Sequence, residues 1–322
     1  MALRLHLGTS KAWKIQHTII VDQSGRGNFT KVQQAIDSIP PGSRQWICIK
    51  LRPGTYNEKV KIPREKPYIL LEGESSKSTI IQYGDHGSSI ESSTFTLEAD
   101  NFAARHITFK NVHLPSKNFM VLIFLQNTYN ALSWAPAAVI QGDKASFLDC
   151  GFIGLQDTLT DAVGRHYFRS CYMEGAVDFI WGGGQSVFEG CTIHVNGAPL
   201  GSLPGFITAQ ARENGEDPSA FVFKYCNVNG SGQAYLGRAI SPYSRVLFYK
   251  STFSQVVAPE GWDPWQYAHQ WYGELGCTGQ GADKSKRVKW LPPFSRKDVL
   301  FLTNATDFIN KENWIGEQLT LL

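Results

Sequence analysis

The sequence predicts an all-β protein, a solenoid in which each turn is one coil of parallel β-strand. The motif F-x-x-C recurs in FLDC, FRSC, FEGC and FKYC, and FYKS repeats it with serine in place of cysteine. These motifs begin at positions 147, 168, 188, 223 and 248, so the intervals are 21, 20, 35 and 25 residues. Short β-type segments at intervals in the low twenties are typical of a β-solenoid. The step of 35 residues predicts a coil that carries a loop insertion.

Composition limits the classes of protein that need to be considered. The chain has 322 residues, of which 42% are hydrophobic and 18% charged, as in an ordinary globular protein. A net charge of +3 is too small and too dispersed to indicate a nucleic-acid partner, but it is compatible with an acidic substrate. The longest apolar run, Phe119–Leu125, is far shorter than a membrane span, and no signal peptide is predicted. We expect a monomer that binds neither nucleic acid nor membrane.

The six cysteines do not form a CxxC pair, so we expect no metal or redox site. In a β-solenoid the stacked phenylalanine and cysteine positions fill the interior, since a free cysteine behaves as a small buried hydrophobe. In a secreted protein, cysteines on adjacent coils can instead form disulfides. The sequence leaves both alternatives open for Cys48, Cys150, Cys171, Cys191, Cys226 and Cys277.

The elements predicted along the chain are a tail over residues 1–16 and a single domain over residues 17–322. A first strand and a glycine-rich turn precede a short helix with Val32, Ile36 and Ile39 on its apolar face and Thr30 as its cap. This helix would close the open end of the solenoid and protect its terminal strand. Further strands are predicted within residues 46–63, 68–74, 78–85, 93–111 and 185–196. After Gly261 we expect loops and then short helical turns that pack back on the solenoid.

One segment, Val112–Gln126, does not fit the coil pattern. It contains the apolar run MVLIFL, and removing it would join ITFKN directly to NTYNA. The interpretation is an insertion that forms a protruding apolar loop.

Two aspartates occupy the same phase of successive coils. Asp157 lies ten residues after Phe147, and Asp178 lies ten residues after Phe168. Neighbouring strands lie roughly 4.8 Å apart, so the two carboxylates should stack at about that backbone spacing. Two like charges so close cannot both ionise easily, which predicts a protonated acid beside an ionised carboxylate. Because the next coil has Ala198 at this position, the aspartates form a local pair, suited to a general acid and a nucleophile or base.

Several stretches occur in order along the chain: GTYNEKV (54–60), GLQDTL (154–159), VDFIWG (177–182), ITAQAR (207–212), YLGRA (235–239), YSRV (243–246) and PEGW (259–262). Together they resemble the plant-type pectin methylesterase (pectinesterase) family, and the resemblance extends from Ile19 to about Gly316. The resemblance implies a right-handed parallel β-helix that hydrolyses methyl esters of polygalacturonate without a metal or cofactor. It further implies methylesterified homogalacturonan (pectin) as substrate, an inhibitor protein as a second partner, and secretion to the cell wall.

The same resemblance implies roles for four residues. Asp178 would be the nucleophile that attacks the ester carbonyl carbon. Asp157 would protonate the leaving methanol and then activate water. Arg238 would orient the Asp178 carboxylate, which a guanidinium can do with two hydrogen bonds. Gln156 would donate an amide N–H to the oxyanion of the tetrahedral intermediate.

The chain departs from the family pattern at positions that bear on substrate binding. Trp134 stands where the family commonly has a glutamine that is a second oxyanion donor, and Ile240 replaces a tryptophan expected to stack on sugar rings. Trp181, where phenylalanine is usual, is predicted to line the site. Tryptophans near PEGW could stack on sugar or belong to the core. The predicted substrate-binding set is Trp134, Trp181, Trp262, Trp265, Tyr56 and Gln210.

Two alternatives to an active pectinesterase follow from the residues. One is a catalytically weakened β-helix that binds acidic polysaccharide or an inhibitor protein. The other is a lyase or glycosidase on the same fold, since paired aspartates also occur in such enzymes. A lyase would normally require calcium ligands, whereas Gln156 and Arg238 favour acyl transfer.

Overall fold

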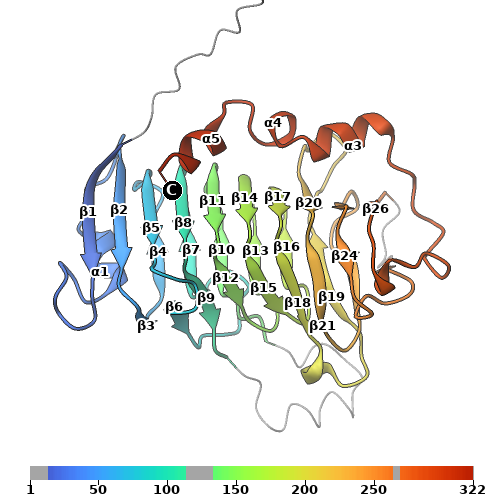
Figure 1. Cartoon of the computed structure of the whole chain (residues 1–322), viewed down its shortest axis with the longest axis horizontal. Coiled ribbons are helices and arrows are strands. Elements are labelled where there is room, and N and C mark those ends of the chain that lie inside the picture. Colours follow the sequence, from blue (N-terminus) through green and yellow to red (C-terminus); the bar gives the residue numbers. More distant parts are fainter. Residues whose placement is uncertain (1–13, 114–132, 264–268, 322) are drawn as a thin grey trace, which may run out of the picture.

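Three parallel sheets run along the length of the molecule, as the computed structural model shows for residues 14–113, 133–263 and 269–321 (Figure 1). Each complete coil contributes one strand to each sheet, and each inner strand of a sheet pairs with the strand one coil before it and the strand one coil after it. The predicted fold class, a parallel β-helix, is therefore confirmed. Among the described residues, no helix is long and apolar enough to cross a membrane.

We name the sheets A, B and C in the order in which a coil visits them. Sheet A contains ten strands and sheets B and C eight each. Sheet A consists of β1 (Ile15–Val21), β2 (Trp46–Leu51), β5 (Ile69–Glu72), β8 (Phe102–Arg105), β11 (Ala145–Leu148), β14 (Arg165–Arg169), β17 (Gln185–Glu189), β20 (Ala220–Lys224), β23 (Arg245–Tyr249) and β26 (Trp271–Leu275). Sheet B consists of β3 (Gly54–Asn57), β6 (Thr79–Tyr83), β9 (Thr108–Asn111), β12 (Gly151–Ile153), β15 (Tyr172–Gly175), β18 (Thr192–Asn196), β21 (Asn227–Ser231) and β24 (Thr252–Phe253). Sheet C consists of β4 (Val60–Ile62), β7 (Phe95–Leu97), β10 (Ala138–Ile140), β13 (Leu159–Asp161), β16 (Ile180–Gly182), β19 (Gly205–Gln210), β22 (Ala234–Ala239) and β25 (Trp262–Asp263).

The F-x-x-C phenylalanines form a continuous stack inside the β-helix. Each is in register with the next on adjacent strands of sheet A. The ring centroids are 5.0, 4.7, 4.5 and 4.4 Å apart, and the planes are tilted by 6° to 11°. All are fully buried, so the repeat marks the core. The stack consists of Phe147, Phe168, Phe188, Phe223 and Phe248.

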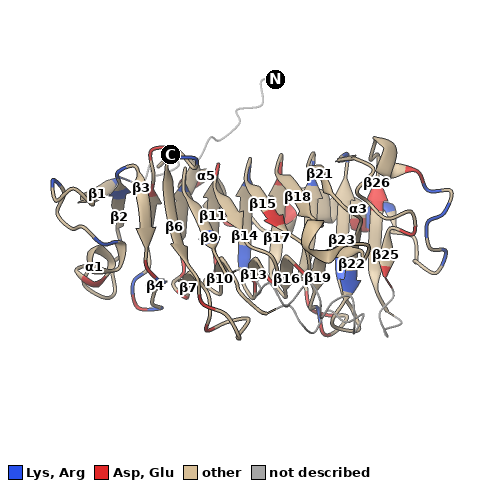
Figure 2. Cartoon of the chain, turned by 90° about the horizontal axis from the view of Figure 1, so that it is seen from below, with Lys and Arg blue, Asp and Glu red and all other residues tan. Residues whose placement is uncertain are grey.

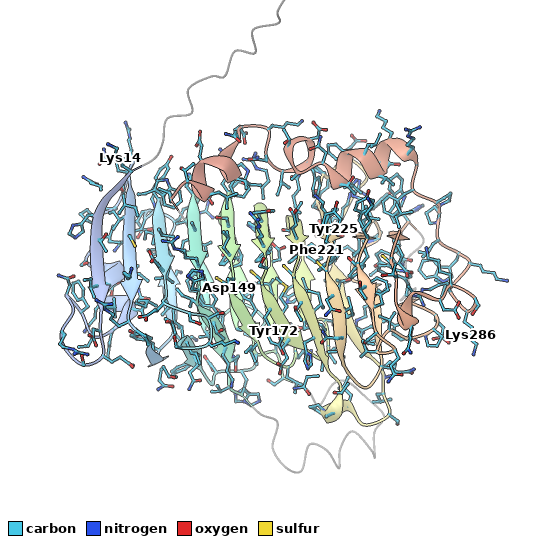
Figure 3. The ribbon with its side chains drawn as sticks, in the orientation of Figure 1. Lys14, Asp149, Tyr172, Phe221, Tyr225 and Lys286 are labelled. Atoms are coloured by element: carbon cyan, nitrogen blue, oxygen red, sulfur yellow. The ribbon has the colours of Figure 1, made fainter. Side chains whose placement is uncertain are left out.

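The residue before each repeat cysteine turns the chain from sheet A to sheet B. Asp149, Ser170 and Tyr225 have φ of 48°, 54° and 56°, in the left-handed region, and Gly190 at the same place has φ of 63°. Figure 3 labels Asp149 and Tyr225 at this corner. A single left-handed residue bends the chain sharply without a loop, which keeps the coils short.

All six cysteines lie among the described residues and are free thiols. The thiols of Cys171, Cys191 and Cys226 donate to the carbonyl oxygens of the phenylalanines one coil earlier, at 3.3, 3.5 and 3.4 Å. The repeat cysteines are buried, so the structure favours the core-filling alternative over disulfides.

The N-terminal end is closed by helix α1 (Val32–Asp37), as predicted, with Val32 and Ile36 in the core. The prediction of Thr30 as its cap is wrong. Lys31 occupies the cap position without a side-chain hydrogen bond, and the Glu58 carboxylate accepts the N–H groups of Val32 and Gln33 at 2.9 and 3.0 Å. An acidic group at this end of a helix accepts hydrogen bonds from the free N–H groups and interacts favourably with the helix dipole.

The C-terminal helical turns are also present, and they cover the outer face of sheet A. They are α3 (Arg296–Thr303), α4 (Ala305–Phe308) and α5 (Trp314–Leu319), which run back along one long side of the molecule (Figure 1). Leu302, Phe308, Trp314 and other apolar residues pack on sheet A. Within the described residues, short 3₁₀ helices are found at η2 (Ala198–Leu200) and η3 (Gln280–Ala282).

Other predictions are tested only in part. The step of 35 residues is a coil with loops at residues 197–204, which include η2, and at residues 211–219. Strand β1 begins at Ile15, just before the predicted domain start. The predicted insertion lies almost entirely outside the described residues, as does most of the predicted tail. The single-domain boundaries and the insertion stay predictions.

Candidate active site

Asp157 and Asp178 lie on adjacent coils, immediately before the sheet C strands β13 and β16. The Asp157 N–H donates to the Val177 carbonyl oxygen at 3.2 Å, and Gln156 forms a parallel bridge with Val177. The backbone of both aspartates is in the left-handed region, with φ of 57° at Asp157 and 48° at Asp178. Such conformations are uncommon outside glycine and tend to collect at functional sites. The structure thus brings together the two carboxyl groups that the repeat spacing paired.

The two carboxyl groups are nearly buried, with 5% of Asp157 and 7% of Asp178 exposed. Burial, and then the neighbouring Asp178 charge, raise the pKa of Asp157 to about 8, although Arg238 acts in the opposite direction. A carboxylic acid with this pKa holds its proton at neutral pH. Asp157 therefore has the protonation state of a general acid.

Arg238, on β22, holds Asp178 with a forked contact. Its Nε donates to Asp178 Oδ1 at 2.8 Å, and its Nη2 donates to Asp178 Oδ2. Burial raises the pKa of Asp178, and the hydrogen bonds and charge of Arg238 counteract that rise. Because the guanidinium forks onto Asp178, we assign the negative charge of the pair to Asp178 and the proton to Asp157.

Gln156 precedes the dyad and is 8% exposed. Within the described part of the chain, its side-chain oxygen Oε1 is buried without a hydrogen-bond partner. The two ends of a glutamine amide exchange by a flip of the side chain, so this position can present either an acceptor or an N–H donor. An amide group with unused hydrogen-bonding capacity beside the dyad is available to a bound ester.

Trp181 lies on β16, three residues after Asp178. It is in register with Thr160 on β13 and with Ala209 on β19. Ala209 is in turn in register with Arg238 on β22. Its side chain is partly exposed, while its Nε1 is buried and lacks a partner among the described residues. Trp181 therefore lies in the row of sheet C residues that contains Arg238, as expected for a residue that lines the site.

Three predicted substrate-binding residues, Tyr56, Trp262 and Gln210, are buried and cannot contact a polysaccharide on the surface. Tyr56 is 1% exposed, and its hydroxyl donates to the Val21 and Arg52 carbonyl oxygens. Trp262 is 1% exposed and stacks on Tyr272, with a centroid distance of 4.5 Å. These two predictions are corrected, because both side chains point into the core.

Gln210 requires the same correction. It is fully buried at the end of β19, and its side-chain oxygen accepts the N–H groups of Arg212 and Arg245 at 3.0 and 2.8 Å. These hydrogen bonds fix the turn that follows the strand, and they leave Gln210 no free face.

The two remaining aromatic residues of the predicted substrate-binding set are Trp134 and Trp265. Trp134 is 52% exposed on the segment that leads into β10, the neighbour of β13 in sheet C. Its carbonyl oxygen accepts the Gly87 N–H at 2.9 Å. The last predicted member of the set, Trp265, lies outside the described residues.

Two aromatic residues were missed. The Arg238 guanidinium carbon lies over the Phe206 ring, 4.3 Å from its centroid, and Phe206 stacks on Tyr235 with centroids 5.5 Å apart. Tyr235 opens the YLGRA motif and could have been found there. Phe206 lies outside every matching motif, and 32 residues separate it from Arg238 in the sequence.

Along the described part of the ribbon, lysine and arginine positions are interspersed with aspartate and glutamate positions (Figure 2). Within the described ranges, no three His, Cys, Asp or Glu side chains gather closely enough to hold a metal ion. The chemistry that the described site can perform is that of a carboxylic acid, a carboxylate, a guanidinium and an amide.

The profile of the family described as Pectinesterase matches residues 18–313. This chain belongs to the pectinesterase family. Probable pectinesterase 29 of Arabidopsis thaliana is 45% identical over 319 residues, which cover 97% of this chain and 93% of the relative. Putative pectinesterase 10 of the same plant is 46% identical over 309 residues, 94% of this chain and 88% of the relative.

Solved structures agree with this assignment. The pectin methylesterase from carrot has a TM-score of 0.84 and 27% identity, with 94% of this chain and 96% of that chain covered. The Aspergillus niger pectin methylesterase has a TM-score of 0.78 and 25% identity, with 95% and 98% covered. The resemblance, the fold class and the enzyme class, a carboxylic ester hydrolase that demethylesterifies pectin, are confirmed. The roles of individual residues stay predictions.

Proposed function

We propose that this pectinesterase cleaves the methyl esters of polygalacturonate with Asp178 as nucleophile and Asp157 as general acid and base. The observation that carries the proposal is the forked contact of Arg238 with Asp178 beside a buried Asp157 whose pKa is about 8. One carboxyl group of the pair is thereby kept ionised and the other protonated. A nucleophile that attacks the ester carbon and an acid that protonates the leaving group each lower the barrier to release of methanol.

In the first half-reaction, an Asp178 carboxylate oxygen attacks the ester carbonyl carbon. Its electron pair forms the new C–O bond, and the carbonyl electrons move to oxygen. When the tetrahedral intermediate collapses, the bond to the methoxy group breaks, and Asp157 donates its proton so that methanol leaves. The products are methanol, an acyl-Asp178 anhydride and ionised Asp157.

In the second half-reaction, the Asp157 carboxylate removes a proton from water. The resulting hydroxide attacks the acyl carbon, and the bond between that carbon and the Asp178 oxygen breaks with its electron pair on Asp178. Asp178 is then ionised and Asp157 protonated, as at the start, and the galacturonic acid carboxyl group that is formed loses its remaining proton to solvent. Arg238 stays bound to Asp178 and limits the charge that develops on it. No cofactor is needed for the atoms and electrons to balance.

Gln156 is proposed as a donor to the oxyanion in both half-reactions, because its amide has unused hydrogen-bonding capacity beside the dyad. Trp134 replaces the glutamine that the family commonly uses as a second donor. Removal of one such donor costs roughly 10²–10³ in rate. We therefore expect Trp134→Gln to increase kcat for pectin, as measured by methanol release, with KM as the control for altered binding. An unchanged or lower kcat would show that Trp134 is no handicap here.

Methylesterified homogalacturonan is the proposed substrate, bound along sheet C with Trp181 in the wall of the site. An inhibitor protein is proposed as a second partner, and a monomer as the active form. Secretion to the cell wall is proposed from the family alone.

The experiment is methanol release from highly methylated pectin by the purified chain and by Asp178→Ala. We expect release by the wild type and loss of it in the variant. Asp37→Ala, which alters an exposed aspartate on α1, is the matched control and should retain activity. New reducing ends or unsaturated products would instead support a glycan-cleaving enzyme. Pectin binding without methanol release would support a catalytically weakened protein.

A further inference from the structure

We propose that Phe206 is a positioning residue that fixes the Arg238 guanidinium on the nucleophile. The inference deepens the proposed function and rests on the role given there to Arg238 and Asp178. Phe206 acts on the nucleophile through Arg238.

The ion pair between Arg238 and Asp178 crosses an intervening strand. Asp178 precedes β16 and Arg238 lies on β22, with β19 between these two strands in sheet C. Two strand spacings correspond to roughly 10 Å, so the Arg238 side chain must extend over β19. The β19 residue in register with Arg238 is Ala209, whose small side chain leaves room for this path.

Strand β19 also supplies the surface on which the guanidinium lies. The Arg238 guanidinium carbon is 4.3 Å from the Phe206 ring centroid. One edge of the guanidinium, through Nε and Nη2, is used by Asp178. The guanidinium carbon lies over the ring while Nε and Nη2 face Asp178, so the two contacts are compatible and together restrict the orientation of the guanidinium. A forked hydrogen bond alone leaves the guanidinium free to hinge about the line of the two donors.

Phe206 is itself held in place. It is 3% exposed, it stacks on Tyr235, and its N–H donates to the Ala176 carbonyl oxygen at 3.0 Å. Ala176 lies two residues before Asp178, so the ring is tied to the coil that carries the nucleophile. Because the ring is buried, a sugar cannot stack on it, and its surroundings favour a role in positioning Arg238 over a role in substrate binding.

The chemical consequence concerns the charge of Asp178. Burial raises the pKa of this carboxyl and Arg238 counteracts it. If the guanidinium loses its support, it spends less time in the forked geometry, and the ionised nucleophile becomes less favourable. Removal of the ring should therefore lower kcat more than it raises KM.

The test compares Phe206→Leu, which removes the ring, with Phe206→Tyr, which keeps it. Phe221→Leu is the matched control, because it removes a fully buried ring from β20 outside the site (Figure 3). The first readout is the pKa of Asp178, measured by ¹³C NMR of labelled aspartate carboxyl groups, with Asp178→Asn used to assign its signal. The second readout is kcat and KM for methanol release. Circular dichroism verifies that each variant is folded.

The proposal predicts that Phe206→Leu raises the pKa of Asp178 and lowers kcat by about 3- to 30-fold, the range of a cation–π contact. Phe206→Tyr should restore both values, and Phe221→Leu should move neither. An unchanged pKa of Asp178 in Phe206→Leu would overturn the proposal and leave Phe206 as a packing residue. A rise in KM alone would overturn it in favour of substrate stacking. If the wild type released no methanol, the proposed function would fail, while the pKa comparison would still decide the role of Phe206.

Discussion

Asp157 is the residue whose ionisation should set the upper pH limit of activity. Its pKa of about 8 arises from burial and from the Asp178 charge. As the proposed general acid it must be protonated, so activity should be present below this pKa and be lost as the pH rises through it. As the proposed nucleophile, Asp178 must be ionised, so activity should also be lost at low pH.

The measurement is kcat/KM for methanol release between about pH 4 and pH 10, since this ratio reports on groups of the free enzyme. We expect a bell-shaped profile with its alkaline limb near pH 8, the pKa of Asp157. A profile that stays flat through the alkaline range would contradict the assignment of the acid.

The same raised pKa makes Asp157 costly for stability. The folded state keeps its proton up to about pH 8, whereas an unfolded aspartate loses its proton near the ordinary value of 3.8. The contribution of Asp157 to stability is therefore fully present below pH 3.8 and is lost as the pH rises to about 8. Asp157→Asn removes this dependence and should stabilise the fold at the upper end of this range by about 1–2 kcal/mol.

Denaturant unfolding at about pH 8 and at about pH 3.5 measures this difference, and the gain should vanish at the lower pH. Asp143→Asn is a control of opposite sign. Arg165 holds the pKa of Asp143 below its usual value, so that substitution should destabilise the protein at the higher pH. A gain for Asp157→Asn that is equal at both pH values would indicate a packing effect.

The residues differ in how far the sequence could identify them. Asp157 and Asp178 could be found from the repeat, because equal phase on successive coils brings them together. Tyr56 and Gln210 were misassigned because membership in a motif does not indicate whether a side chain faces the core or the surface. Phe206 was missed because only the register of β19 and β22 brings it to its partner Arg238, on the next coil.

At the scale of the element, the corner between sheets A and B depends on one left-handed residue in each coil that carries the F-x-x-C repeat. Gly190 occupies this place with φ of 63°, and a Cβ added there would meet no atom within 4 Å. Any cost of Gly190→Ala is therefore conformational, and we expect a loss of about 1–2 kcal/mol in the free energy of unfolding. Gly190→Asn should cost less, because asparagine tolerates this conformation.

Denaturant unfolding measures both variants. Gly215→Ala is the control, since Gly215 is exposed, lies outside the positive-φ positions, and has only a Tyr243 ring atom 3.9 Å from the added Cβ. It should be neutral or slightly stabilising. An equal loss at both glycines would argue against the left-handed corner as the cause.

The elements were predictable where their signal was local and repeated. The F-x-x-C motif predicted the coils that carry it because five successive strands of sheet A place a buried phenylalanine at the same register position. The cap of α1 was predicted one position away from the observed one, because a local rule placed it on Thr30. The actual partner of the first N–H groups, Glu58, lies 26 residues after Val32 and becomes adjacent only when the next coil forms.

At the scale of the whole molecule, one end and one face of the β-helix are covered by different parts of the chain. Helix α1 closes the first coil, and α3, α4 and α5 cover sheet A. The sequence predicted that helical turns pack back on the solenoid. It could not indicate which sheet they cover, because the apolar outer residues of sheet A, such as Val187 and Val222, are indistinguishable in sequence from core residues.

This separation predicts that stability and activity can be changed independently. Trp314 is 3% exposed on α5, and its Nε1 donates to the Ile309 carbonyl oxygen at 2.7 Å. Trp314→Ala should cost about 3–5 kcal/mol in the free energy of unfolding, because it removes a large buried side chain between the helices and sheet A.

The proposed catalytic pair lies before strands of sheet C, and Trp314 packs on sheet A, so kcat/KM measured well below the unfolding temperature should not change. Leu300→Ala is the control on α3, since Leu300 is 59% exposed and its loss should alter stability by less than about 0.5 kcal/mol. The measurements are thermal unfolding and methanol release at low temperature. A fall in kcat/KM for folded Trp314→Ala would mean that the helices also fix the position of sheet C, and the covering of sheet A would then be part of the catalytic architecture.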